Sequence, residues 1–257
     1  MLQARLLRPY TEKYFRSAGL APGMRVLDLG SGVGDVALLC GDIVGPAGRV
    51  LGLDRDAAAV ERARRRTVEQ GCSSWVSFEV ADLDDFVAGE RFDAVVGRYV
   101  LLYQRDAATT IRRFTAFLGL GGIVAFHELD FTNANSTFPP CERFDQTIRL
   151  LAEVFRRSGA PPDFGRRLGR TFLDAGLPFP TIVAESPVGG GPRSFVYPWI
   201  AATLLNVAPR MSALGIEVPR DFALDDSLAR RLEEEAVELG AQLVGPVQYG
   251  AWARKSE

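Results

Sequence analysis

Short apolar runs alternate with helix-like segments over the first half of the chain. Five runs have the composition of buried strands: 26–29, 49–54, 76–83, 91–99 and 121–128. The intervening segments 35–44, 56–70 and 106–118 have the character of helices, and Asp56 is placed to cap the second. Strands that alternate with helices in this way predict right-handed β-α-β units and a parallel sheet.

The pattern changes after residue 130. Two more helices and two more strands are expected there, at 141–158, 164–175, 181–185 and 246–255. Residues 194–214 are unusually rich in apolar and aromatic side chains, and 225–242 has the pattern of a charged amphipathic helix. An apolar excess beyond what a surface helix needs favours either a pocket for an apolar molecule or a dimer interface.

The first predicted strand leads into a glycine-rich turn between Asp28 and Asp35. Its glycines, Gly30, Gly32 and Gly34, allow positive φ angles and a close approach of the backbone to a ligand. The helix that follows would point its N-terminal amides at that ligand. The spacing is G-x-G-x-G rather than the G-x-G-x-x-G of dinucleotide sites, and two flanking carboxylates suit an ammonium better than a pyrophosphate. The turn therefore favours a cationic nucleoside that carries an amino acid over NAD.

Two more acids end predicted strands. Asp54 closes the second strand, twenty residues after Gly34, where an acidic side chain can accept hydrogen bonds from both hydroxyls of a ribose. Asp82 closes the third strand, where it is placed to take an exocyclic amine. The acids and the turn together predict a nucleoside site at one edge of the sheet.

The glycine turn, Asp54, Asp82 and the Phe92-Asp93 strand, in this order and spacing, resemble the class I S-adenosylmethionine-dependent methyltransferases. The chain is most similar to the small-molecule group that includes the ubiquinone and menaquinone C-methyltransferases. The resemblance covers residues 20–130 well and only the general layout beyond them. It implies a doubly wound, Rossmann-like α/β fold whose seven-stranded sheet is mostly parallel, with strand seven antiparallel and helical cap insertions. It also implies S-adenosyl-L-methionine (SAM) as cofactor and S-adenosyl-L-homocysteine as product.

The resemblance divides the chain into three parts. Residues 1–20 form an N-terminal helical segment. Residues 21–190 and 244–257 form the SAM-binding Rossmann-like methyltransferase domain, and residues 191–243 form an inserted helical cap.

Ten positions match the cofactor-binding residues of the family: Asp28, Gly30, Ser31, Gly32, Gly34, Asp54, Arg55, Asp82, Leu83 and Arg98. The resemblance places the turn under the methionine part of SAM and Asp54 at its ribose. Asp82 and the backbone of Leu83 would recognise the adenine. Asp28 either contacts the α-ammonium, directly or through water, or holds the turn. Arg55 either lies on the adenine face or is solvated.

Two residues are candidates for a part in catalysis. Tyr99 follows the fourth strand on the edge of a parallel sheet where ligands bind, and it lines either the acceptor pocket or the core. His127, the only histidine, lies near the end of the fifth strand. It either removes a proton from the acceptor or is a half-buried strand residue satisfied by a backbone carbonyl. Alignment alone carries most of the rate effect when the acceptor is already nucleophilic.

Composition narrows the class of protein further. The net charge of −2 gives no general attraction to nucleic acid or to an anionic membrane. There is no run of 18 apolar residues and no apolar signal core near the N-terminus. The three cysteines are widely spaced, lack a metal-binding pattern and are typical of reduced thiols. We therefore expect a cytoplasmic protein without a metal, whose partner is a small-molecule acceptor.

These features together predict a SAM-dependent methyltransferase that methylates a small, largely apolar metabolite by in-line displacement. One alternative is a SAM-binding protein without methyl transfer, pericyclase-like or regulatory, which would keep the same turn and acids. A nicotinamide-dependent oxidoreductase is the other alternative, and both the glycine spacing and Asp28 disfavour it. The apolar segment 194–214 leaves a homodimer open.

Overall fold

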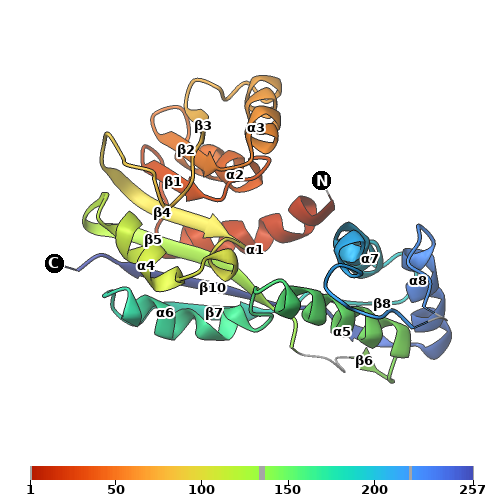
Figure 1. The fold of residues 1–257 in the computed structure, drawn as a ribbon. Coiled ribbons are helices and arrows are strands. Elements are labelled where there is room, and N and C mark those ends of the chain that lie inside the picture. Colours follow the sequence, from red (N-terminus) through yellow and green to blue (C-terminus); the bar gives the residue numbers. More distant parts are fainter. Residues whose placement is uncertain (1, 133–136, 220–221, 257) are drawn as a thin grey trace. The chain divides into compact units, whose positions relative to one another are not determined.

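The computed structural model describes residues 2–132, 137–219 and 222–256, which form two compact units. The sheet unit comprises Leu7–Glu128, Arg166–Val183 and Tyr249–Glu257, and the helical unit comprises Met1–Leu6, Leu129–Gly165 and Ala184–Gln248 (Figure 1). The predicted parts divide the chain differently, and their boundaries stay a prediction. Some positions of those parts lie outside the described residues: 1, 133–136, 220–221 and 257.

A seven-stranded sheet with the strand order β3-β2-β1-β4-β5-β10-β7 forms the centre of the sheet unit. Its strands are β1 (Arg25–Leu29), β2 (Arg49–Asp54), β3 (Val76–Val80), β4 (Phe92–Arg98), β5 (Leu118–Asp130), β7 (Thr181–Glu185) and β10 (Val247–Arg254). The helices around it are α1 (Leu2–Ala18), α2 (Asp35–Val44), α3 (Ala57–Glu69), η1 (Leu101–Tyr103, a 3-10 helix), α4 (Ala107–Thr115), η2 (Phe164–Arg167, also 3-10) and α6 (Leu168–Asp174). The predicted doubly wound, Rossmann-like fold is confirmed.

The strand order reverses between β1 and β4. Leu27 of β1 pairs in parallel with Leu51 of β2 on one side and with Val95 of β4 on the other. The chain therefore leaves β1 toward β3 and returns to start again at β4. At such a reversal the connections after the two strands diverge, and a crevice forms at their carboxyl ends.

Strand β10 runs antiparallel to β5. The N–H of Gly121 donates to the carbonyl of Lys255 at 2.9 Å, and the N–H of Lys255 donates to the carbonyl of Gly122 at 2.8 Å. The start of β5 therefore meets the end of β10. The antiparallel last strand is thus confirmed.

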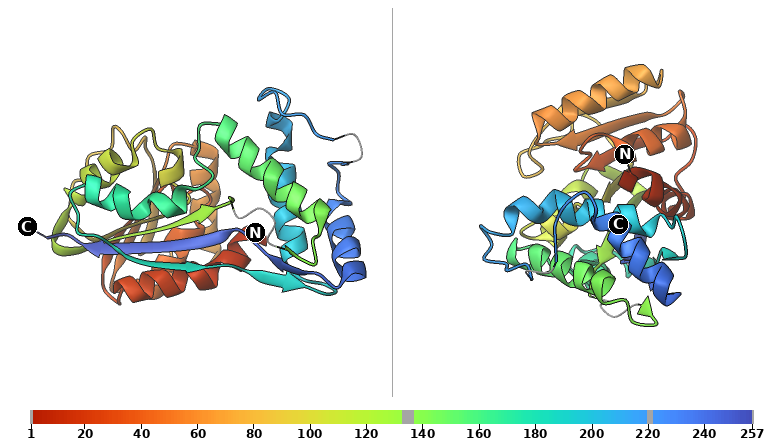
Figure 2. Two further views of the ribbon diagram at one scale, coloured as in Figure 1. Left: turned by 90° about the horizontal axis from the view of Figure 1, so that it is seen from below. Right: turned by 90° about the vertical axis from the view of Figure 1, so that its right-hand side faces the viewer.

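Both faces of the sheet are covered, with α4 and α6 on one side and α1 on the other (Figure 2). Tyr14 and Phe15 of α1 share a buried core with side chains of α2, α3 and the strands between them. On the opposite face the ring of Phe172 in α6 lies 6.3 Å from that of Phe126 in β5. Burial of these large side chains is the main favourable contribution to folding.

Local details follow the sequence at the start of α3 and differ from it at the third strand, at the fifth strand, which runs from Leu118 to Asp130, and at 164–175. Helix α3 begins as predicted, because the Asp56 carboxylate accepts the N–H groups of Ala58 and Ala59. The third strand ends at Val80 rather than at 83, because the chain turns at Asp82. The carbonyl of Asp82 accepts the N–H groups of Asp85 and Phe86. The single helix expected at 164–175 is divided into η2 and α6.

The helical unit contains three helices and a small sheet. The helices are α5 (Glu142–Arg157), α7 (Val196–Val207) and α8 (Leu228–Leu239), with the 3-10 helix η3 (Ala208–Arg210) after α7. The small sheet has the order β6-β9-β8, from β6 (Thr137–Phe138), β9 (Gln242–Val244) and β8 (Val188–Gly190). Helix α7 packs against both α5 and α8. Its apolar and aromatic side chains, among them Tyr197, Trp199 and Ile200, are buried in this core.

Candidate functional site

The glycine turn between β1 and α2 contains three left-handed residues. Gly30, Gly32 and Gly34 have φ angles of 65°, 53° and 88°, a region that side chains rarely tolerate. A Cβ on Gly30 would lie 2.7 Å from Cγ2 of Val100, and one on Gly34 would lie 2.7 Å from Cζ of Phe78. A Cβ on Gly32 would meet no atom of the described residues within 4 Å. Packing therefore requires glycine at the first and third positions, whereas the second faces open space.

Asp54, at the end of β2, is hydrogen-bonded to this turn. One of its carboxylate oxygens accepts the N–H of Gly32 at 2.8 Å, and the other accepts the N–H of Asp56 at 2.9 Å. The N–H of Ser31 also donates to the carbonyl of Leu53 at 2.8 Å, and the buried Ser31 hydroxyl has no hydrogen-bond partner among the described residues. Because each carboxylate oxygen can accept more than one hydrogen bond, Asp54 can brace the turn and still accept ligand hydroxyls.

The two acids that flank the turn have different surroundings. Asp35 is paired with Arg66 at 2.7 Å and, more loosely, with Arg98 at 3.8 Å. Asp28 is 1% exposed, and neither of its carboxylate oxygens has a hydrogen-bond partner in the described part of the chain. Burial raises the pKa of Asp28 well above its usual value, and the nearby charge of Arg98 opposes that rise. A cationic ligand group beside Asp28 would offset the cost of burying this carboxylate.

A cavity of about 440 Å³ in the sheet unit lies at the carboxyl ends of the parallel strands. Twelve residues line it: Gly30, Asp54, Arg55, Ala81, Asp82, Leu83, Asp84, Tyr99, Val100, Tyr103, Gln104 and Arg105. The structure thus brings five predicted cofactor residues together with Tyr99. The other predicted cofactor residues do not line this cavity, namely Asp28, Ser31, Gly32, Gly34 and Arg98.

Asp82 shapes the floor of the cavity through local hydrogen bonds. Its side-chain oxygen Oδ1 accepts the N–H of Asp84 at 3.0 Å, and its carbonyl accepts those of Asp85 and Phe86 at 3.1 and 3.0 Å. The Asp82 side chain is exposed. The tight turn therefore holds the backbone of Leu83 beside a carboxylate that remains accessible to a ligand.

His127 is fully buried and held by a hydroxyl group. Its Nδ1 lies 2.9 Å from Oγ1 of Thr11, whose hydroxyl donates to the carbonyl of Leu7 at 2.9 Å. The Arg98 guanidinium also donates to Thr11 Oγ1, at 3.2 Å. A hydroxyl carries a single hydrogen, so Thr11 accepts from both His127 and Arg98. This assigns the Nδ1–H tautomer to a neutral His127, with the lone pair on Nε2.

Aromatic rings flank His127. The ring of Tyr14 lies edge-on at 5.1 Å and that of Tyr99 at 5.4 Å between centroids. The N–H of Tyr99 donates to the carbonyl of His127 at 2.9 Å, and Tyr99 has a positive φ of 56°, which is uncommon outside glycine. Of the two candidate catalytic residues, Tyr99 therefore lines the cavity, whereas His127 lies outside its lining.

Several residues that build this region are not among the predicted site residues. Thr11 of α1 holds both Arg98 and His127, and Glu128 accepts hydrogen bonds from the chain after β4. Gln104 and Arg105 line the cavity. Thr11 carries no local signal, because its role depends on packing of α1 against β5.

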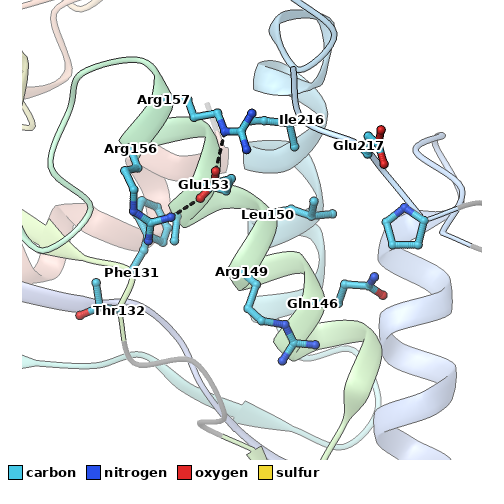
Figure 3. A pocket seen from close by; sticks show the side chains of 12 residues that line it. Phe131, Thr132, Gln146, Arg149, Leu150, Glu153, Arg156, Arg157, Ile216 and Glu217 are labelled. Carbon is cyan, nitrogen blue, oxygen red and sulfur yellow. Dashed lines mark hydrogen bonds and ion pairs between the residues drawn. The ribbon is translucent and has the colours of Figure 1, made fainter. Parts of the chain in front are cut away.

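The helical unit has a pocket of its own, of about 590 Å³ (Figure 3). Phe131, Leu150 and Ile216 supply apolar lining. On the α5 wall, Arg156 and Arg157 both point to Glu153, which pairs with each of them. Glu153 carries one negative charge, so it offsets only part of the positive charge of these two guanidinium groups.

Three structural facts bear on chemistry outside these pockets. Within the described ranges, no group of three or more histidine, cysteine, aspartate or glutamate side chains could hold a metal ion. None of the described helices is long and apolar enough to cross a membrane. Cys40, Cys72 and Cys141 are free, buried thiols, and burial raises the pKa of Cys141 to about 11.

Comparison with known proteins gives a consistent picture. Residues 20–158, more than half of the chain, match the family described as "Methyltransferase domain". An uncharacterized 37.1 kDa protein in transposon TN4556 of Streptomyces fradiae is 30% identical over 182 residues, which are 70% of this chain and 51% of that protein. Aklanonic acid methyltransferase DauC of Streptomyces sp. (strain C5) is 34% identical over 147 residues, with 56% and 66% of the two chains covered.

A quinone enzyme is also among the relatives. The ubiquinone/menaquinone biosynthesis C-methyltransferase UbiE of Xylella fastidiosa (strain M12) is 26% identical over 156 residues, 60% of this chain and 61% of the enzyme. The chain thus spans about half to two thirds of the length of these curated relatives.

The fold is shared with a solved methyltransferase. The geranyl diphosphate C-methyltransferase of Streptomyces coelicolor A3(2) superimposes with a TM-score of 0.57 at 16% identity, over 98% of this chain and 81% of that one. Because the family match covers more than half of the chain, and the glycine turn and sheet order agree with it, the chain belongs to the methyltransferase domain family and resembles its class I SAM-dependent members, among them the enzymes of quinone biosynthesis.

Proposed function

We propose that the protein transfers a methyl group from SAM to a small, largely apolar acceptor. The observation that carries this proposal is the combination of an open glycine turn with the buried carboxylate of Asp28. Gly32 faces open space, and Asp28 has no hydrogen-bond partner in the described part of the chain. The α-ammonium of an amino-acid ligand would supply the missing donor, either directly or through a water molecule. Asp35 is less suited to that task, because Arg66 and Arg98 already bind it.

The cavity in the sheet unit supports an adenosine site. In our proposal Asp54 accepts the ribose hydroxyls while it braces Gly32. Asp82 accepts the exocyclic amine of adenine, and the N–H of Leu83 faces the ring nitrogen beside it. Arg55 lines the same cavity and is exposed, so its guanidinium can lie over the adenine face.

The chemistry expected of this site is an in-line displacement. SAM supplies a methyl group on a positively charged sulfur, which makes the methyl carbon electrophilic. An electron pair of the acceptor forms the new bond to that carbon while the carbon–sulfur bond breaks. The protein would contribute alignment and exclusion of water, which together account for most of such a rate enhancement. Tyr99 lines the cavity and is placed to shape the acceptor side.

His127 is our candidate for the general base when the acceptor must lose a proton. The Nδ1–H tautomer set by Thr11 leaves a lone pair on Nε2, the arrangement that a base requires. The contrasting hypothesis is a packing role, supported by complete burial between Tyr14 and Tyr99. The acceptor decides between them, since a thiolate or another strong nucleophile needs no base.

The helical unit supports the proposed acceptor class. A pocket of about 590 Å³ lies within the size range of small-molecule sites, and Phe131, Leu150 and Ile216 give it an apolar part beside its polar and charged lining residues. The aromatic side chains of 194–214, by contrast, are largely used in the core around α7, so they supply less support than their composition indicated.

We also propose that the protein is cytoplasmic and that its partner is a small molecule rather than nucleic acid or a membrane. Three free thiols and a net charge of −2 support this environment and partner class. Some exposed apolar side chains, among them Phe138 and Phe179, leave a homodimer as a further hypothesis.

Labelled SAM incubated with small-molecule extracts tests the proposal. We expect transfer of label to an apolar product in the presence of the protein and none in buffer alone. Tight binding of SAM without a labelled product in any extract would instead favour a SAM-binding protein that does not transfer methyl groups.

A variant pair tests the acceptor class once a product is found. Ile216→Gln, in the lining of the helical-unit pocket, is expected to lower product formation and to leave SAM affinity unchanged. Val237→Gln, at an exposed position of α8, serves as the matched control and should change neither quantity. Equal product formation by both variants would remove this pocket from the proposal.

A further inference from the structure

Glu128 is a buried carboxyl group to which the proposed function assigns no role. It lies in β5 one residue after His127 and is 0% exposed. Its Oε1 accepts the N–H groups of Val100 at 3.1 Å and of Leu101 at 2.8 Å. Its Oε2 is buried and has no hydrogen-bond partner among the described residues. A carboxyl group that is only half satisfied in a protein interior is costly, so its position calls for a physical reason.

The hydrogen bonds of Glu128 cap a helix on another part of the chain. The first N–H groups of a helix have no partner within it. Helix η1 begins at Leu101, and the residue before it, Val100, has no polar side chain with which to cap it. Glu128 supplies that acceptor from β5, 27 residues away in sequence. One oxygen therefore fixes the point at which the chain leaves β4.

The segment that Glu128 holds forms one wall of the cavity in the sheet unit. Five of the twelve lining residues belong to it: Tyr99, Val100, Tyr103, Gln104 and Arg105. The segment starts with the positive φ of Tyr99, a conformation that needs support from its surroundings. Val100 also lies against the glycine turn, since its Cγ2 is 2.7 Å from the point where a Cβ on Gly30 would stand.

We propose that Glu128 is a positioning residue for the cofactor pocket, which acts by holding the Tyr99–Arg105 wall against the glycine turn through the amides of Val100 and Leu101. The proposal rests on the proposed function, because it takes SAM as the ligand of this cavity. It requires that the acceptor oxygen, and not merely the bulk of the side chain, keeps the wall in place.

A matched pair of variants separates these two contributions. Glu128→Gln keeps an acceptor oxygen, whereas Glu128→Met fills a similar volume and has no comparable acceptor. Glu128→Asp, which shortens the reach by one carbon, is the second test variant. Ile111→Ala, in the buried face of α4 and outside the cavity lining, is the control for general destabilisation.

Two readouts are measured on the full chain: hydrogen–deuterium exchange of residues 99–105, and SAM affinity by calorimetry. For Glu128→Met we expect at least tenfold faster exchange of the Val100 and Leu101 amides and at least tenfold weaker SAM binding. Glu128→Gln should stay within threefold of the parent in both, and Glu128→Asp should fall between them. Ile111→Ala should lower the melting temperature with little change in either readout.

The outcomes are distinguishable from failure of the proposed function. Exchange at the parental rate in both Glu128→Met and Glu128→Asp would overturn the proposal, and so would faster exchange with unchanged SAM affinity. An equal loss of SAM affinity in Ile111→Ala would also overturn it, because the effect would then be general. A parent protein that does not bind SAM would refute the proposed function, while the exchange readout would still show whether Glu128 holds the wall.

Discussion

Asp54 and Gly32 are joined by a hydrogen bond of 2.8 Å from the glycine N–H to the carboxylate. The acid proposed to hold the ribose is therefore the same acid that orders the glycine turn. This relationship couples two parts of the proposed cofactor site that are 22 residues apart in sequence, the turn after β1 and the end of β2. Ligand contacts and turn geometry should consequently respond together to a change at Asp54.

Replacement of Asp54 by alanine should weaken SAM binding by about 1–3 kcal/mol, the scale of hydrogen bonds to a charged group. The loss has two sources, the ribose contacts and the brace on Gly32. Isothermal titration calorimetry measures it directly. Asp54→Asn should lose less, because its amide oxygen still accepts one of the two backbone N–H groups.

The neighbouring carboxylate provides the control for that experiment. Asp56 caps α3 and does not line the cavity, so Asp56→Ala should lower stability by about 1 kcal/mol and leave SAM affinity unchanged. Parental SAM affinity in Asp54→Ala would refute the placement of the ribose at this residue.

The glycine turn offers a test that separates folding from binding. Gly34→Ala should destabilise the protein by about 1–2 kcal/mol from its left-handed backbone, with about 1–3 kcal/mol more from the contact with Phe78. Gly32→Ala should cost only the backbone contribution, because no atom of the chain's described part lies within 4 Å of the new Cβ. Urea denaturation compares the two free energies of unfolding.

SAM binding should be strongly weakened by the substitution Gly32→Ala. If the methionine part of SAM lies over this residue, a methyl group there occupies ligand space, and Gly32→Ala should fold yet bind SAM at least tenfold more weakly. A folded Gly32→Ala variant with parental SAM affinity would show that the open space above Gly32 is not the cofactor site.

His127→Ala should lower turnover by about 10²-fold or more and spare SAM affinity if the imidazole is the base. The rate of label transfer to the acceptor found in the extracts and the calorimetric affinity are the two measurements. Thr11→Val is the companion variant. It removes the hydroxyl that sets the tautomer of His127 and that holds the imidazole ring in place. Equal rates for His127→Ala and the parent would assign His127 to packing.

Glu128 should make stability depend on pH in a defined direction. Burial raises its pKa from 4.5 to about 8, opposed by the backbone N–H groups of Leu101, Val100 and Leu102. The folded state therefore holds this proton more tightly than the unfolded state does. Stability from Glu128 is fully present below about pH 4.5 and is lost as the pH rises toward 8.

The matched measurement is the melting temperature from pH 5 to pH 9 for the parent and for Glu128→Gln. The parent should lose more stability than the variant over this range, because glutamine does not titrate. Parallel curves for the two proteins would show that Glu128 does not change its ionisation on folding. Asp28, whose pKa burial also raises, contributes equally to both curves and cancels in the difference.

Features with local causes could be predicted from the sequence. The helices after the glycine turn and after Asp56 begin where their first residues indicate, because caps and turns depend on a few neighbouring residues. The turn itself was identifiable from glycine spacing, and all three glycines have the left-handed backbone that this spacing indicates.

Features that depend on long-range packing could not be predicted from the sequence. Both Asp28 and Asp35 flank the turn in sequence, yet Arg66 and Arg98 bind one of them and leave the other buried without a partner in the described residues. The aromatic excess of 194–214 suggested a pocket or an interface, whereas much of it fills the core around α7. His127, which the alternative to catalysis describes as half-buried, is fully buried, and its Nδ1 lies against the Thr11 hydroxyl.

The sequence by itself determined the alternation of strands and helices, the glycine turn and the acids that follow the strands, because backbone preferences and hydrophobic periodicity act over short distances. Only the tertiary structure decided which acid is left without a hydrogen-bond partner in the described residues, which residue holds His127 and which carboxyl group binds the chain after β4. Thr11, Asp28 and Glu128 acquire these roles from partners far away in the chain. Such partners come into contact only when the sheet and its helices pack, so no local pattern in the sequence predicts these contacts.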